Sequence, residues 1–357
     1  MKRIDFFLLV SVSFLTLFGL FMIYDASSFV AFRDFADKYH YVKDQAFWIA
    51  LGTVSLFLFS RIDYHKFYNL AIPILIAAIG LLVLVFVPGI GVKILGAHRW
   101  INLRFTVFQP SEFVKLALAI YLAAWFSSKE KGRLWSFLFL LSAVLILVIL
   151  EPDMGTAAII LAEGIALYFL SGASVLYFAF LAPVIGIIGF IFTKLEPYRA
   201  ARLATFLNVN QNISSSSYHV RQILIALGSG GLTGVGLGNS LQKYAYLPEN
   251  TTDSIFAIVA EELGFIGACF IIAVFLVIVW RGFAIASLAK DNFGKLLAGG
   301  ITTFLAAQIL INLAAQTALV PLTGIPLPFI SYGGSALILN LSSIGILLNI
   351  ARQGKSI

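Results

Sequence analysis

The chain has 357 residues, of which 60% are apolar and only 11% are charged, and its mean hydropathy is +0.97. About 25% of the residues in an ordinary soluble domain are charged, so this composition excludes a soluble enzyme and indicates an integral membrane protein. The net charge of +7 would suit nucleic acid, but in a membrane protein basic residues mainly report orientation. We therefore expect no nucleic-acid partner.

Ten apolar stretches are candidates for spanning helices. Each span needs about 20 residues to cross roughly 30 Å of hydrocarbon, and only helices or closed barrels satisfy their backbone in lipid. No alternating strand pattern competes, so we predict an all-α polytopic membrane protein with about ten transmembrane helices in a single domain, residues 1–357. The predicted spans are Ile4–Tyr24, Gln45–Phe59, Tyr68–Val87, Ser111–Phe126, Leu134–Leu150, Gly155–Leu170, Leu176–Thr193, Ser254–Trp280, Leu296–Val320 and Ser335–Ile350.

The basic residues set the expected orientation. Lys2 and Arg3 precede the first span, and Arg352 and Lys355 follow the last. Because Lys and Arg accumulate on the cytoplasmic side, ten spans place both termini in the cytoplasm. The long polar loop between helices 7 and 8, residues 194–253, then lies outside the cell. Other basic residues lie on this outer side against the trend, which indicates an anionic ligand there.

Polar residues crowd into four segments, 96–115, 151–156, 218–264 and 323–335. On the ten-helix topology, all four segments face the outside or enter the membrane from it. The halves of the chain show no internal repeat of the kind from which many transporters are built. The sequence therefore predicts one site on the outer face, assembled from several segments.

The first of these segments ends in Gln109–Lys115, which opens a helix with Pro110 at its first position and Glu112 in its first turn. Lys115 does not fit helix-start chemistry, because it lies about 7 Å into the helix. A charge at that depth is costly unless it is paired or faces a cavity, and Glu112 is the expected partner. Whether Lys115 is structural or functional stays open from the pattern.

The second segment, Glu151–Thr156, joins two spans by a tight turn. Pro and Gly are ordinary turn residues, so the segment can be a turn alone. Alternatively, its acids Glu151 and Asp153 bind a cation or orient a sugar hydroxyl at the membrane face. Asp153 is therefore a candidate metal ligand.

The third segment contains a glycine-dense stretch, residues 228–238, which matches neither a Walker A loop nor a dinucleotide-binding fingerprint. It forms either tight turns after a short helix, Tyr218–Leu227, or a nest of backbone N–H groups for a phosphate. The same segment contains Asp253, directly before an apolar helix. That position is typical of an N-cap, so capping competes with a catalytic role.

Further along the same helix, Glu261 and Glu262 lie about 12 Å and 13.5 Å from Asp253 along the helix axis. Buried acids need partners, and Lys115 or an arginine of the outer loops is the expected one. Glu163 lies at similar depth in another predicted span. These acids are the residues of the sequence that suit a transport function.

The fourth segment, 323–335, combines Pro and Gly within a few residues of the last span. Irregular backbone at membrane depth is allowed only where it is buried in protein or lines a cavity. We therefore predict a re-entrant segment that forms one wall of an outward-facing cleft and carries Ser331. On the helix before it, the stripe Gln308, Asn312 and Gln316 indicates interhelical hydrogen bonds.

Together these stretches resemble the SEDS family of shape, elongation, division and sporulation proteins. The resemblance implies ten transmembrane helices in the bacterial plasma membrane and a peptidoglycan glycosyltransferase that polymerises lipid II into glycan strands outside the cell. It also implies a class B penicillin-binding protein as partner. The stretches that carry it are Gly96–Ile101, Gln109–Lys115, Glu151–Thr156, Ala226–Gly231, Tyr246–Asp253, Glu261–Gly264 and Thr323–Ser335.

The resemblance assigns Asp253 to the aspartate that the family requires for polymerisation, and we expect it to act as general base. We expect positive charge, or a divalent cation such as Mg²⁺ or Mn²⁺ near Asp153, to stabilise the leaving pyrophosphate. Glu151 departs from the family, which usually has glutamine there. The expected substrate-binding residues are Lys115, Arg104, Arg99, Glu112, Asp153, Glu261 and Ser331.

Two other function classes compete with the polymerase. A flippase for the lipid-linked precursor predicts symmetric halves and a site near the midplane, and a non-catalytic scaffold would not need the clustered outer motifs. Within the family, the short termini favour an elongation protein over a division protein. No organic cofactor is expected.

Overall fold

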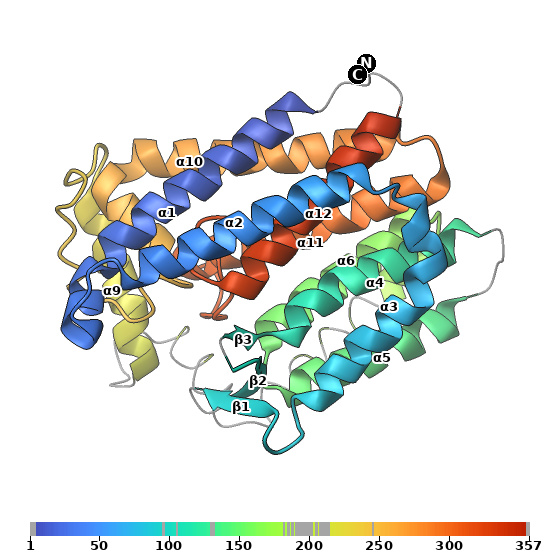
Figure 1. Ribbon diagram of the computed structural model, residues 1–357, viewed down its shortest axis with the longest axis horizontal. Helices are drawn as coiled ribbons and strands as arrows, with labels where there is room; N and C mark the ends of the chain where they lie inside the picture. The colour runs from blue at the N-terminus through green and yellow to red at the C-terminus, as the bar shows by residue number, and fades with distance from the viewer. Residues whose placement is uncertain are drawn as a thin grey trace.

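The computed structural model describes residues 5–354 except 95–96, 105, 129–132, most of 181–214, and 245. Its helices pack side by side into an elongated bundle, and the two ends of the chain lie together at one end of it (Figure 1). The helices are α1 (Phe6–Phe35), α2 (His40–Arg61), α3 (His65–Leu84), α4 (Pro110–Ser127), α5 (Leu134–Leu150), α6 (Met154–Leu170), α9 (Ser215–Gly230), α10 (Ile255–Leu288), α11 (Asn292–Gln316) and α12 (Gly334–Gln353).

This architecture confirms the all-α polytopic fold. Helices α1, α2, α3, α10, α11 and α12 are long and apolar enough to cross a membrane, and α5 and α6 are shorter apolar helices. The seventh predicted span, Leu176–Thr193, lies largely outside the described residues.

Several helices are longer than the predicted spans. Helix α1 continues past the predicted end at Tyr24 to Phe35, because no Gly or Pro interrupts residues 20–35. It ends at Ala36, which adopts a left-handed conformation with φ 54°. The apolar residues of a sequence show which part of a helix can lie in lipid. The helix itself continues until a helix-breaking residue or a capping residue ends it.

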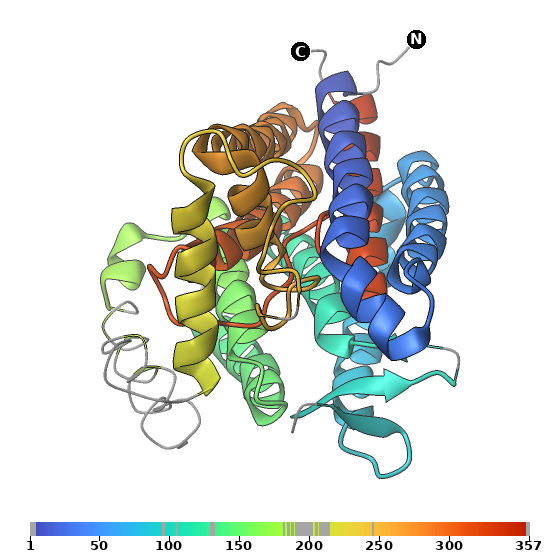
Figure 2. The same cartoon turned by 90° about the vertical axis from the view of Figure 1, so that its left-hand side faces the viewer.

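A small antiparallel sheet stands between α3 and α4 and was not predicted. Its strands are β1 (Gly91–Ile94), β2 (Ala97–Asn102) and β3 (Val107–Phe108), in the order β1-β2-β3. The strands are too short for a periodic pattern to reveal them. The sheet lies at the end of the bundle opposite the termini, as does α9 (Figures 1 and 2).

Helix α4 is the centre of the bundle. It packs against α3, α6, α11 and α12, and most of its residues are buried. The outer helices instead present large apolar side chains outward, such as Trp135 and Phe139 on α5, each 79% exposed. Extended apolar exposure marks a surface that faces lipid or a partner.

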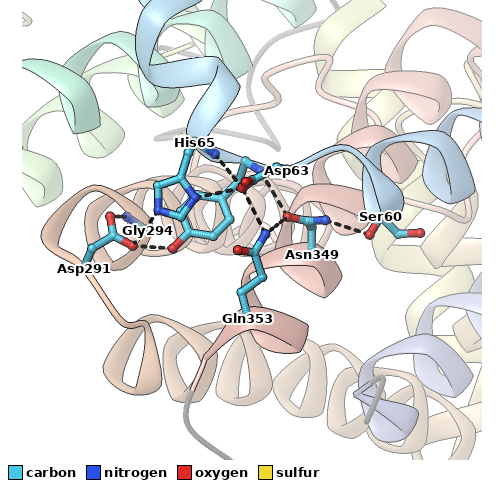
Figure 3. A network of polar contacts seen from close by, with 8 residues as sticks. Ser60, Asp63, His65, Asp291, Gly294, Asn349 and Gln353 are labelled. Carbon is cyan, nitrogen blue, oxygen red and sulfur yellow. Dashed lines mark hydrogen bonds and ion pairs between the residues drawn. The ribbon is translucent and has the colours of Figure 1, made fainter. Parts of the chain in front are cut away.

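At the end of the bundle near the termini, the loop between α2 and α3 is fastened to α11 and α12 (Figure 3). Asn349 accepts a hydrogen bond from the Tyr64 backbone N–H at 3.1 Å and donates to the Ser60 carbonyl at 2.8 Å. Gln353 and His65 hydrogen-bond the Asp63 carboxylate, which lowers the pKa of Asp63 to about 2. This network fixes the end of the bundle that is remote from the predicted site.

The glycine-dense stretch packs against a break in α10. Gly264 has φ 68° and ψ −171°, so the helical hydrogen bonding is interrupted there. The N–H groups of Val235 and Gly236 donate to the carbonyls of Glu261 and Glu262 at 3.0 and 3.1 Å. These N–H groups are therefore used by α10 and are not a phosphate nest, and the tight-turn alternative is confirmed.

Gly234 is expected to tolerate no side chain, because its φ is +81° and a Cβ there would lie 2.0 Å from the Glu262 carbonyl oxygen. Gly231 is a matched control, since it has φ +53° but open space around its Cβ position. We expect Gly231→Ala to destabilise by about 1–3 kcal/mol through backbone strain alone, and Gly234→Ala to destabilise clearly more. Thermal unfolding of both variants in detergent measures the difference, and equal midpoints would contradict the close packing.

Candidate functional site

The four polar segments meet at the end of the bundle opposite the termini. Helices α4, α6, α10 and α12 begin there and α11 ends there (Figure 1). At the start of α6, a Cβ on Gly155 would lie 2.5 Å from Ile325 and 3.2 Å from the Thr323 carbonyl oxygen. The second and fourth segments are therefore in direct contact, as the sequence predicted.

Asp253 lies half-buried in the turn before α10. Ser254 is the N-cap residue of α10, and Asp253 directly precedes it. Thr252 Oγ1 donates to Asp253 Oδ1 at 3.3 Å, and a Cβ on Gly324 would lie 3.9 Å from Asp253 Oδ2. The carboxylate thus lies against the re-entrant segment, within reach of the predicted cleft wall.

That wall is irregular as predicted, with no helix between the end of α11 and Gly334. The Ser331 hydroxyl donates to the Thr252 carbonyl and accepts from the Leu327 N–H at 2.8 Å. The Tyr332 N–H donates to the Thr251 carbonyl at 2.9 Å. Ser331 therefore ties the wall to the turn that carries Asp253, and its predicted contact with substrate stays a prediction.

A small cavity lies behind the wall. Its polar lining comes from Gln308, Ser331 and Asn340, and the prolines 326 and 328 with Leu327 and Phe329 supply most of the apolar lining. From the other side, Gln45 of α2 accepts from the Gly333 N–H at 3.3 Å. The segment is thus held between α11 and α2.

Lys115 and Glu112 form the predicted pair, with 2.9 Å between Lys115 Nζ and Glu112 Oε1. Lys115 Nζ also donates to Gln308 Oε1 at 2.6 Å. The two side chains are only 1% and 3% exposed. The ammonium is therefore enclosed in the bundle beneath the re-entrant segment and joins α4 to α11.

Asp153 is the N-cap residue of α6. Its Oδ1 accepts from the Thr156 N–H at 3.0 Å, and its Oδ2 accepts from Thr156 Oγ1 at 2.8 Å and Gln109 Nε2 at 3.1 Å. These hydrogen bonds engage both oxygens of Asp153 and fix its carboxylate at the start of α6. In the described part of the chain, no group of three or more His, Cys, Asp or Glu side chains is arranged to hold a metal. The divalent cation near Asp153 stays a prediction.

Arg99 of β2 fastens the turn between α5 and α6. Its guanidinium donates to the carbonyl oxygens of Glu151 and Pro152. A cation here complements the carbonyl end of α5. Arg104 differs, because it is exposed between β2 and β3 and holds a left-handed backbone with φ 72°.

Glu151 is completely buried in the same turn, and neither carboxylate oxygen has a hydrogen-bond partner among the residues that the structure describes. Burial, with the nearby charge of Asp153, raises the pKa of Glu151 to about 9, although Arg99 opposes the shift. At neutral pH the side chain is therefore a neutral acid. It has the shape of the glutamine that the family resemblance places at this position.

The Glu151 carboxyl is expected to make stability fall as pH rises. The folded pKa of about 9 lies above the unfolded value of 4.5, so between these values the unfolded state gives up a proton that the folded state keeps. Glu151→Gln removes this dependence. We expect its thermal midpoint to exceed that of the wild type by a margin that widens from pH 5 to pH 9. A constant difference between the midpoints of the two proteins from pH 5 to pH 9 would show that Glu151 is already ionised in the folded protein.

The partners expected for Glu261 and Glu262 were wrong. Glu261 accepts from the hydroxyls of Ser229 and Ser240, and Glu262 pairs with Lys243 at 3.2 Å rather than with Lys115. Ser229 lies in the last turn of α9, and Ser240 and Lys243 follow α9 in the chain, where the glycine-dense stretch brings them beside α10. The structure thus separates Glu261 from the cluster around Asp253, and its predicted contact with substrate stays a prediction.

Sequence reasoning missed two contributors to the site. His219 of α9 hydrogen-bonds Ser254, the residue after Asp253, with 2.7 Å between Nε2 and Oγ. Asn312 of α11 donates to the Asp253 carbonyl oxygen at 3.0 Å. The amide stripe on α11 was recognised, and its predicted bonds to other helices are confirmed by Gln308 with Lys115 of α4 and by Gln316 with the Ala257 N–H of α10. Helical spacing does not reveal that Asn312 instead bonds the loop backbone at Asp253 and Ile325.

The comparisons with known proteins agree with this geometry. The family model of FtsW, RodA and SpoVE, described as cell cycle proteins, matches residues 6–356. Stage V sporulation protein E of Bacillus subtilis (strain 168) is 39% identical over 98% of each chain. A probable peptidoglycan glycosyltransferase FtsW of Geobacter sp. (strain M18) is 40% identical over 99% of each chain.

A solved structure from a study of how a peptidoglycan synthase complex coordinates polymerization and crosslinking superimposes with a TM-score of 0.81. It is 25% identical, and the match covers 98% of each chain. The fold is thus shared over nearly the whole length of the chain. The chain belongs to the FtsW, RodA and SpoVE family of cell cycle proteins, the SEDS family.

Proposed function

We propose that this chain is a peptidoglycan glycosyltransferase that polymerises lipid II, with Asp253 as its general base. The observation that carries the proposal is the meeting of four polar segments around one half-buried carboxylate at one end of an apolar bundle. The relative from Geobacter is named as a probable enzyme of this class. A site at the bundle end suits sugars that are anchored to the membrane by a lipid.

The reaction joins the 4-hydroxyl of one lipid-linked disaccharide to the anomeric carbon of another. The Asp253 carboxylate takes the hydroxyl proton as the oxygen attacks, and the bond to undecaprenyl pyrophosphate breaks with the electron pair leaving on the phosphate oxygen. An α-linked pyrophosphate becomes a β-1,4 bond, so the centre inverts. A single inversion needs one base and no carboxylate nucleophile.

The leaving pyrophosphate needs positive charge. Of the three predicted cations, Lys115 and Arg99 are engaged inside the protein, and Arg104 is exposed at the end of the bundle that carries the site. We therefore assign the direct contact to Arg104 and a supporting role to Lys115 and Arg99. A divalent cation near Asp153 stays part of the proposal, and no step of this reaction is routed through it.

The membrane and a protein partner complete the proposed setting. The start of α1 and the end of α12 lie at the end of the bundle opposite the site (Figure 1). Because basic residues adjoin these two helix ends in the sequence, the positive-inside tendency supports our proposal that this end faces the cytoplasm and the site faces outside. A class B penicillin-binding protein is the proposed partner, because it would crosslink the glycan strand made here. The synthase complex to which this fold is similar couples these two steps.

One assay tests the proposal against a flippase. The purified protein with its transpeptidase partner and labelled lipid II is expected to give glycan ladders on a gel. The flippase alternative draws on Glu163, which is buried with neither carboxylate oxygen hydrogen-bonded in the described part of the chain. Translocation of lipid II in vesicles with no ladders would support the flippase and overturn the polymerase.

The biological process within cell-wall synthesis stays a prediction. Elongation and rod shape are the process we predict, whereas the two relatives carry sporulation and FtsW names. Depleting the protein in its own host distinguishes the processes. Rounded cells would support elongation, and long undivided cells would support division.

A further inference from the structure

Three amide side chains on α11 connect three of the four polar segments of the proposed site, those that contain Lys115, Asp253 and Ile325. Gln308, Asn312 and Gln316 follow one another at four-residue spacing, so they lie on one face of the helix. All three are at most 2% exposed. Burying an amide side chain costs free energy of desolvation, so buried amides are nearly always hydrogen-bonded. The hydrogen-bond partners of these three amides are residues of the proposed site.

Asn312 is the central member of this stripe. Its Nδ2 donates to the carbonyl oxygens of Asp253 at 3.0 Å and of Ile325 at 2.7 Å. Its Oδ1 accepts from Gln316 Nε2 at 2.6 Å, and Gln316 Oε1 accepts from the Ala257 N–H at 2.8 Å. Both hydrogens of the Asn312 amide are therefore used, and Gln316 fixes which way the amide points.

These two carbonyls lie on either side of the proposed base. One belongs to Asp253 itself, and the other belongs to the residue after Gly324, whose Cβ position would be 3.9 Å from Asp253 Oδ2. Asn312 thus sets the separation between the turn that carries the carboxylate and the wall that faces it. Gln308 continues the arrangement by donating to the Pro326 carbonyl at 3.0 Å while accepting from Lys115.

We propose that Asn312 is a positioning residue for polymerisation, which holds the Asp253 carboxylate against the re-entrant segment at the distance that the attacking hydroxyl requires. This inference rests on the proposed function, because it assumes that Asp253 is the base. A displacement of about 1 Å in a reacting group lowers the rate by about 10²-fold. We expect the loss of this positioning to lower kcat and to leave KM unchanged, because Asn312 is buried behind the site and does not face substrate.

The structure supplies a matched control at the opposite end of the bundle. Asn349 of α12 is also a buried asparagine whose amide is hydrogen-bonded to two backbone groups, those of Ser60 and Tyr64 (Figure 3). Replacing either asparagine with leucine removes a clamp of the same kind from the same bundle. Only the loss at Asn312 should change the chemistry at Asp253.

The test is steady-state polymerisation of lipid II by the full chain with its transpeptidase partner. We expect Asn312→Leu to lower kcat roughly 10- to 100-fold with KM for lipid II unchanged, and Asn349→Leu to leave both constants unchanged in the folded fraction. If Asn312→Leu fails to fold, Asn312→Asp keeps the shape and replaces the donor with an acceptor. A raised KM, or equal losses of kcat at both positions, would overturn the proposal.

Asp253→Asn in the same assay separates this inference from the function on which it rests. An inactive Asp253→Asn together with a wild-type kcat for Asn312→Leu would overturn only the positioning role. A fully active Asp253→Asn would overturn the base assignment, and the positioning of that base with it.

Discussion

Replacing Asp253 with asparagine is expected to lower the rate of lipid II polymerisation by about 10²- to 10⁴-fold, the usual contribution of a general base. The substitution keeps the shape of the side chain and removes the oxygen that takes the proton. The fold should survive, because Ser254 is the N-cap of α10 and Asn312 holds the Asp253 backbone rather than its carboxylate. Glycan ladders from purified protein, quantified over time, measure the effect.

The matched control is Asp37→Asn. Asp37 is a partly exposed acid in the loop between α1 and α2, where it pairs with the exposed Lys43 at 2.8 Å. Exposed pairs of this kind contribute at most about 1 kcal/mol, so this variant should polymerise lipid II like the wild type. Ladders of wild-type intensity from Asp253→Asn would remove Asp253 from the chemistry. Loss of folded protein in Asp253→Asn would instead give the aspartate a structural role.

The fold was predictable because lipid restricts the choices. A backbone in hydrocarbon must be helical or form a closed barrel, so apolar content alone indicated the class and most of the spans. Helix ends were less predictable. Helix α1 runs to Phe35 because helical propensity continues beyond the apolar stretch, and the strands of the small sheet are too short to show a period.

The site was predictable to the extent that its residues are local in sequence. Lys115 and Glu112 pair as their three-residue spacing indicated, and the breakers of segment 323–335 gave the irregular wall. Long-range partners were not predictable. Lys243 reaches Glu262 only because the glycine-dense stretch crosses the break in α10, and no spacing along the chain reports such a crossing.

Lys115→Met is expected to destabilise the protein by about 3–5 kcal/mol, because it leaves the Glu112 carboxylate buried without its cation. The second oxygen of Glu112 already has no hydrogen-bond partner in the described part of the chain, so little else there would compensate the charge. The yield of folded protein and its thermal midpoint in detergent measure this loss.

The double variant Lys115→Met/Glu112→Gln is expected to recover most of that stability, because both charges are removed and the volumes are kept. Its activity then separates the two roles of Lys115. If the ammonium only joins α4 to α11 through Gln308, the folded double variant still polymerises lipid II. If Lys115 also stabilises the leaving pyrophosphate, the double variant folds but its kcat stays low. Lys115, rather than Arg104, would then be the residue that contacts the pyrophosphate. If the double variant is as unstable as Lys115→Met, the unpaired charge of Glu112 is not the cause of the instability. The lost hydrogen bond from Lys115 to Gln308, which supports the re-entrant segment, would then be the cause.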